Sequence, residues 1–119
     1  MSTTVGDNIS AFKKESVTIS ASGTTSNGLD LDKFGFSIVG IYMPAAFTGT
    51  SISFLTSNDG STYSDLYNAS NTLISMGVTQ GRVYQLSPGD LTALRYIKIK
   101  SSATEGSDRI ITLIARLMG

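Results

Sequence analysis

Short stretches in which apolar and polar residues alternate recur along this chain of 119 residues, and turn-forming residues separate them. In the clearest stretch, 94–101, Ile97 and Ile99 are predicted to face inward while Tyr96, Lys98 and Lys100 face outward. A period of two residues is the signature of a half-buried β-strand. Further alternating or wholly apolar stretches lie at 15–21, 34–43, 51–56, 63–67, 72–78, 82–86 and 109–118. About eight short strands predict an all-β domain, a single β-sandwich or jelly-roll-like fold.

Several local signals refine this prediction. The stretch 34–43 is apolar on both faces, which predicts a central strand covered on both sides, and it stops at Pro44. The stretch 109–118 is also apolar on both faces. The pair Asp59-Gly60 indicates a hairpin or tight turn. The segment 90–94 is predicted to form one helical turn.

The length of the chain fits one domain with one hydrophobic core. Residues 1–14 are polar and lack a sustained period, so they are predicted to form a flexible N-terminal arm. Residues 15–119 are predicted to form the β-sandwich domain.

The sequence contains no histidine and no cysteine. Ser-His and Cys-His nucleophilic sites are therefore excluded, as are ordinary zinc sites. Carboxylate chemistry, lysine chemistry and oxygen-ligated Ca²⁺ or Mg²⁺ remain open. Asp30 and Asp32 could ligate Ca²⁺, and Asp59 with Asp65 could form a glycosidase pair. All four are more simply turn residues, so we expect no enzymatic activity, no metal and no cofactor.

The nine basic and nine acidic residues give a formal net charge of zero. A nucleic-acid-binding protein normally carries a basic patch, so we expect no nucleic-acid partner. No apolar run approaches the ~20 residues that span a bilayer, and no signal peptide is visible, so we expect no membrane association. Because net charge normally keeps small domains apart in solution, this neutrality is a modest indication that a partner covers part of the surface.

The candidate partner-binding residues come from two sources. An ordered arm could bind a neighbouring subunit through its last residues. Exposed aromatic rings could contact either a protein or a sugar. Most of these rings are expected in the core or an interface, and the absence of tryptophan weakens the sugar interpretation. The candidates are Phe12, Lys13, Lys14, Phe47, Tyr63 and Tyr67.

The middle of the chain resembles a known family. The segments that carry the resemblance are GIYMPAAF at 40–47, SFLTSNDGSTYSDLY at 53–67, GR at 81–82, LSPGD at 86–90 and LRYIKIKS at 94–101. In this order and spacing they resemble small virion proteins of tailed bacteriophages, over roughly residues 30–115. The piece SNDGSTY alone also resembles discoidin-like and other sugar-binding β-sandwiches.

The resemblance implies a structural role without catalytic residues. It implies a capsid decoration, or cement, protein that is made in the host cytoplasm and stabilises the virion at its capsid surface. Its partners would be the major capsid protein and copies of itself. The alternatives are a neck, tail or fibre component, or a carbohydrate-binding module involved in host recognition. A carboxylate hydrolase acting through Asp59 and Asp65 is a third possibility.

Overall fold

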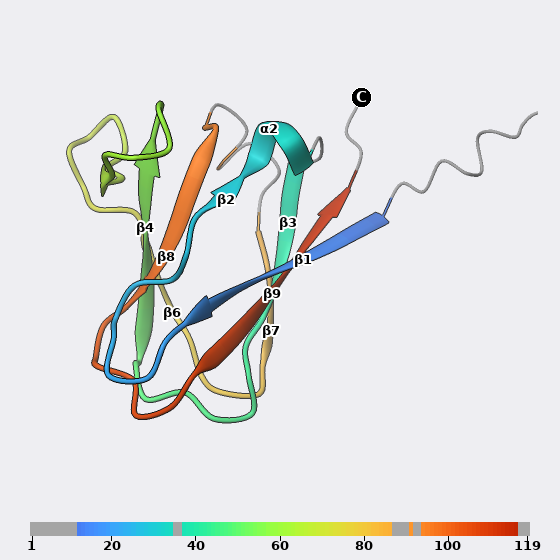
Figure 1. The fold of residues 1–119 in the computed structure, drawn as a ribbon, viewed down its shortest axis with the longest axis vertical. Helices are drawn as coiled ribbons and strands as arrows, with labels where there is room; N and C mark the ends of the chain where they lie inside the picture. The colour runs from blue at the N-terminus through green and yellow to red at the C-terminus, as the bar shows by residue number, and fades with distance from the viewer. Residues whose placement is uncertain (1–11, 35–36, 87–90, 92–93, 117–119) are drawn as a thin grey trace, which may run out of the picture.

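The computed structural model describes residues 12–34, 37–86, 91 and 94–116. Within them, nine strands form two antiparallel sheets that pack face to face as a β-sandwich (Figure 1). The all-β sandwich predicted from the alternating pattern is therefore confirmed. The elements are β1 (Phe12–Ile19), β2 (Leu29–Asp30), α2 (Leu31–Phe34), β3 (Ser37–Tyr42), β4 (Ser51–Ser57), β5 (Ser64–Asp65), β6 (Ser75–Gly77), β7 (Val83–Gln85), β8 (Tyr96–Ser101) and β9 (Arg109–Arg116).

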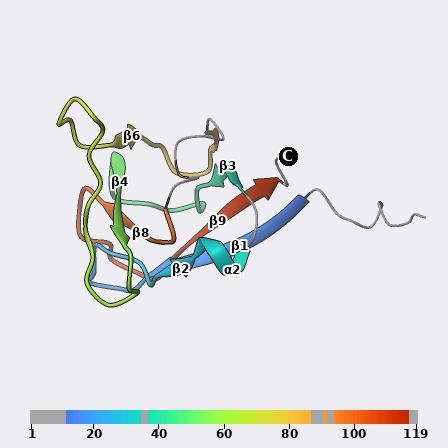
Figure 2. The ribbon, with the colours of Figure 1, turned by 90° about the horizontal axis from the view of Figure 1, so that it is seen from above.

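The two sheets differ in strand order. The four-stranded sheet runs β1-β9-β3-β7, and the five-stranded sheet runs β2-β8-β4-β5, with β6 also paired to β4. The first strand therefore pairs with the last one along its full length, from Phe12 opposite Arg116 to Ile19 opposite Arg109. Seen from above, β4 and β8 form one layer while β1, β3 and β9 form the other (Figure 2).

The core lies between the sheets and is built from the inward side chains of the longer strands. In β8, Ile97 and Ile99 are buried while Tyr96, Lys98 and Lys100 are partly exposed, as the alternation predicts. The other buried apolar residues are Val17, Ile19, Leu31, Ile38, Ile41, Met43, Phe47, Ile52, Phe54, Val78, Leu91, Ile111, Leu113 and Ala115.

A bulge in β3 changes the prediction made for the stretch 34–43. The register against β9 shifts between Ile38 and Gly40, so Val39 is an extra residue on this strand. In a regular strand, residues three positions apart point to opposite faces. Because of the extra residue, Ile38 and Ile41 both point into the core. The strand is central, as predicted, but Tyr42 at its end is 49% exposed, so its second face is not fully covered.

Strand β9 is likewise apolar on both faces but is buried on only one. Its inward residues Ile111, Leu113 and Ala115 are buried, whereas Ile110 is 57% exposed on the opposite face. The apolar character of both faces therefore does not mean that both faces are buried.

Other local predictions can be compared with the structure. The Asp59-Gly60 signal marks a true hairpin, in which β5 returns alongside β4 and pairs Thr56 with Ser64. Gly60 has a φ of 81°, which an L-residue adopts only with strain. The short helical segment α2 was not predicted. The predicted helical turn at 90–94 lies mostly outside the described residues.

At the N-terminus, β1 begins at Phe12 rather than at Glu15. Phe12, Lys13 and Lys14 thus belong to a strand paired with β9. The rest of the predicted arm, residues 1–11, lies outside the described residues.

Candidate binding surfaces

The tip of the β4–β5 hairpin is organised by Asp59. Its Oδ1 atom accepts hydrogen bonds from the backbone N–H groups of Ser61 and Thr62, at 2.8 and 3.0 Å, and from the Ser57 hydroxyl at 2.8 Å. These hydrogen bonds, those from Thr62 and Ser61 foremost, lower the pKa of Asp59 to about 2. A general acid needs a pKa near the working pH, so Asp59 does not suit the acid role of a glycosidase pair. The carboxylate fixes the turn.

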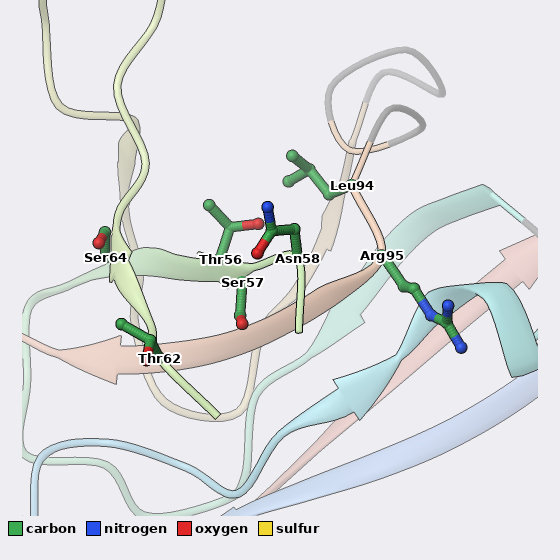
Figure 3. A pocket seen from close by; sticks show the side chains of 7 residues that line it. All are labelled: Thr56, Ser57, Asn58, Thr62, Ser64, Leu94 and Arg95. Atoms are coloured by element: carbon green, nitrogen blue, oxygen red, sulfur yellow. The ribbon is translucent and has the colours of Figure 1, made fainter. Parts of the chain in front are cut away.

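A hollow lined mainly by hydroxyl groups lies beside this hairpin and encloses about 610 Å³. We call it the hydroxyl hollow. Figure 3 shows its lining side chains, with the Arg95 guanidinium pointing away from the hydroxyl groups. The ion pair between Arg95 Nε and Asp30 Oδ1, at 3.5 Å, accounts for that direction. The lining residues are Thr56, Ser57, Asn58, Thr62, Ser64, Leu94 and Arg95.

A second hollow, of about 490 Å³, lies between β2 and the same hairpin. We call it the tyrosine hollow because two tyrosine rings contribute to it. Lys98 Nζ lies 4.4 Å from the centre of the Tyr63 ring, and the Arg95 guanidinium carbon lies 4.9 Å from the centre of the Tyr96 ring. Both distances suit cation–π attraction. The lining residues are Asn27, Gly28, Asp30, Gly60, Ser61, Tyr63, Tyr96 and Lys98.

The pKa of Tyr63 is raised, chiefly because burial disfavours the phenolate and then because of the charges of Tyr96, Asp59 and Asp30. Tyr63 therefore keeps its proton at neutral pH and can donate a hydrogen bond from its hydroxyl.

The outer face of the four-stranded sheet forms a third surface with a different character. Tyr42 lies opposite Val83 on one side and Thr112 on the other. Thr112 in turn lies opposite Ser16, and their hydroxyl oxygens are 3.4 Å apart, which places both side chains on this face. Ile110, two residues before Thr112, points the same way.

We call Val83, Tyr42, Thr112 and Ile110 the apolar row. Val83, Tyr42 and Ile110 are exposed by 58%, 49% and 57% of their surface. None of the four side chains is charged. Three exposed apolar side chains thus lie near one another on this face, and exposed apolar patches are typical of surfaces that partners cover.

The outer face of the five-stranded sheet is polar by comparison. Lys98 and Lys100 point outward from β8. On β5, Asp65 lies opposite Leu55 of β4. The outer face of the four-stranded sheet thus carries the apolar row beside Lys14 and Ser16 of β1, whereas the outward residues of β8 include two lysines.

A fully buried carboxylate stabilises the end of the sandwich where β3 connects to β4 and β8 to β9. Glu105 accepts hydrogen bonds from the N–H groups of Thr48 and Gly49, at 2.8 and 3.0 Å, and from the Ser101 hydroxyl at 2.8 Å. It also pairs with Arg109. Burial raises the pKa of Glu105, but the hydrogen bonds outweigh it and lower the pKa to about 2. We call these residues the Glu105 cluster, and its role is structural.

The structure separates the six residues predicted to bind a partner. Phe47 is 7% exposed and belongs to the core, so its ring does not form a surface contact. Lys13 and Lys14 are exposed on β1, and Phe12 begins that strand. Tyr63 lines the tyrosine hollow. Tyr67 is 51% exposed and bridges Leu73 outside the hollow.

Of the two carboxylates that could hold Ca²⁺, that of Asp30 has other partners. Asp30 Oδ1 accepts the N–H of Asp32 at 3.1 Å and pairs with Arg95. In the described part of the chain, no three acidic residues gather in a way that could hold a metal ion. In the same part of the chain, no helix is both long and apolar enough to cross a membrane.

Sequence reasoning missed the apolar row and the Glu105 cluster. Tyr42 lies in an apolar stretch predicted as a central strand, and for Val83 and Ile110 the sequence predicted strands without indicating which face is exposed. Glu105 lies in the polar stretch 102–108, and the only local signal was an arginine four residues later.

Comparison with known proteins supports the fold. The chain matches no model of a known protein family, and no curated protein is similar to it in sequence. Among solved structures, the crystal structure of SPBc2 prophage-derived protein YomS is similar, with a TM-score of 0.53 and 15% sequence identity. The similarity covers 89% of this chain and 95% of that one. The two chains therefore share the β-sandwich fold over nearly their full lengths.

Proposed function

We propose that this chain is a non-enzymatic structural protein of a bacteriophage particle, which decorates the capsid by binding the lattice of the major capsid protein. The observation that carries the proposal is the apolar row on the outer face of the four-stranded sheet. In this arrangement the apolar row docks on the shell, and the charged face of β8 points to solvent.

Three further observations support this proposal. The segments quoted above resemble small virion proteins of tailed phages, and the structurally similar YomS is itself a prophage-derived protein. A protein that coats a repeating shell also needs only a modest interface, because many identical contacts on one lattice add up. A net charge of zero lets neighbouring copies sit close together with little repulsion.

The proposal is tested by co-sedimentation with capsids that lack the protein. Wild-type protein is expected to pellet with capsids in a saturable manner. The double variant Val83→Lys/Ile110→Lys places two charges on the apolar row and is expected to stay in the supernatant. Both positions are exposed, so the variant should fold normally.

The matched control is Leu73→Lys, which adds a charge at an apolar residue that is 38% exposed and lies outside the apolar row. It is expected to bind capsids as wild type does. If the double variant still pellets like wild type, the apolar row is not the docking surface. If wild-type protein never pellets with capsids, the decoration role is wrong.

A further inference from the structure

The tyrosine hollow has the composition of a ligand site rather than of a structural contact. It lies on the five-stranded sheet, where β2 and the tip of the β4–β5 hairpin flank the start of β8. Binding pockets combine aromatic surface with a few convergent polar groups. Here two half-buried tyrosine rings are joined by the amide of Asn27, the carboxylate of Asp30 and the hydroxyl of Ser61.

Two glycines allow the rings to take these positions. A Cβ atom on Gly60 would lie 3.3 Å from Cζ of Tyr96, and one on Gly28 would lie 2.5 Å from the Tyr63 hydroxyl. Any other residue at Gly28 would therefore displace the Tyr63 side chain. Together with the cation–π contacts of Lys98 and Arg95, the glycines hold both rings in place before a ligand arrives, which lowers the entropic cost of binding. Because Gly60 and Arg95 both contact the Tyr96 ring, Tyr63 is the ring that would stack on a ligand.

We propose that the tyrosine hollow binds a carbohydrate. The face of a tyrosine ring carries negative charge density, which attracts the positively polarised C–H groups of a sugar ring. Amide, carboxylate, hydroxyl and ammonium groups supply the acceptors and donors that sugar hydroxyls need. Asn27, Asp30, Ser61 and Lys98 bring one such group each to the rim of the hollow.

Single-stranded nucleic acid also stacks on tyrosines beside basic residues. Two carboxylates argue against it at this place. Asp30 lines the hollow and pairs with Arg95, and Asp59 is close enough to raise the pKa of Tyr63. Both would repel phosphate groups, and the chain as a whole carries no net positive charge.

The inference does not depend on the proposed capsid role. The tyrosine hollow belongs to the five-stranded sheet and the apolar row to the four-stranded sheet. A protein that docks through the apolar row would leave the hollow open, so both surfaces can be occupied at once.

The test uses the isolated full-length protein on an array of neutral and acidic oligosaccharides, followed by titration calorimetry with the sugars that bind. Wild type is expected to bind a subset of the array. Gly28→Ala is expected to weaken binding at least about tenfold, or about 1.4 kcal/mol, because the displaced Tyr63 ring no longer stacks on the sugar. Tyr63→Ala removes the ring itself and is expected to weaken binding at least as much.

Two controls match these variants. Gly106→Ala adds the same methyl group where no atom lies within 4 Å, and Tyr67→Ala removes an exposed tyrosine outside the hollow. Both are expected to bind as wild type does, and thermal unfolding confirms that every variant is folded. The proposal is overturned if wild type binds no sugar, if Gly28→Ala binds as tightly as Gly106→Ala, or if wild type binds oligothymidylate in place of sugars. Capsid co-sedimentation is measured separately, so failure of one proposal leaves the other standing.

Discussion

The Nε atom of Arg109 lies 2.8 Å from Oε1 of Glu105, whose side chain is completely buried at one end of the sandwich. The same carboxylate accepts hydrogen bonds from the backbone N–H groups of Thr48 and Gly49. One side chain therefore connects the loop between β3 and β4 to the loop between β8 and β9. A buried charge is tolerated here because every polar contact that it needs is present.

Removing this charge should destabilise the protein. Glu105→Gln keeps the shape of the side chain but leaves Arg109 without its ionic partner, and Arg109 is only 15% exposed. Loss of one partner of a buried pair costs about 3 kcal/mol or more in the free energy of unfolding. Urea unfolding at pH 7 measures the change. A loss below about 1 kcal/mol, the level of an exposed ion pair, would show that the Glu105 cluster contributes little.

The Glu105 cluster also predicts how stability depends on pH. The folded-state pKa of Glu105 is about 2, below the roughly 4.3 of an unfolded glutamate. A depressed pKa means that the stabilisation is complete above the unfolded value and is lost as the pH falls toward 2. Unfolding followed between pH 7 and pH 2 should show this loss in wild type.

Asp59 has a similar pKa, so it contributes to acid sensitivity as well. Asp59 is exposed, so solvent screens its interactions more than those of the buried Glu105. The variant Asp59→Asn should therefore retain most of the pH dependence, whereas Glu105→Gln should reduce it. If the free energy of unfolding depends on pH equally in wild type and in Glu105→Gln, Glu105 is not the source of the pH dependence.

Two neighbouring isoleucines test which face of β9 is buried. Ile111 is 0% exposed and Ile110 is 57% exposed, although they are adjacent in sequence. Ile111→Ala should destabilise the protein by about 2–5 kcal/mol, and Ile110→Ala should change stability by no more than about 0.5 kcal/mol. Thermal or urea unfolding distinguishes them. Similar losses for both variants would mean that the outer face is covered in the isolated protein.

A glycine in the Glu105 cluster should not tolerate a side chain. A Cβ atom on Gly49 would collide with the Ser101 hydroxyl and lie 3.1 Å from the Phe47 ring. Gly49→Ala is therefore expected to cost about 1–3 kcal/mol through overpacking. The Gly106→Ala variant, where the added methyl group meets open space, provides the comparison in the same unfolding assay. If Gly49→Ala is as stable as Gly106→Ala, the packing described here is wrong.

The sequence predicts the inward faces of β4 and β8 well, because alternation over several residues leaves little choice of register. It predicts the burial of β3 and β9 less well. Composition shows that Tyr42 and Ile110 are apolar, but it does not show whether a second layer covers them. The bulge at Val39 shifts the register of β3 against β9, and no local feature of the sequence predicts this shift.

The candidate surfaces were harder to foresee, because they are assembled from distant segments. Tyr63 was singled out from the sequence, but its partners in the hollow come from residues 27–30 and from β8. Phe47 looked equally suitable for a surface and is part of the core. Aromatic residues in loops can serve either purpose, and only the packing of the two sheets decides between them.

The most direct test of the proposed function is the number of copies of this chain in purified particles of the phage that encodes it. Quantitative mass spectrometry against the major capsid protein measures this number. Decoration of the capsid predicts a copy number equal to that of the capsid protein or to a simple fraction of it. A ring-sized number would place the protein in the neck or tail, and its absence from the particles would contradict a virion role.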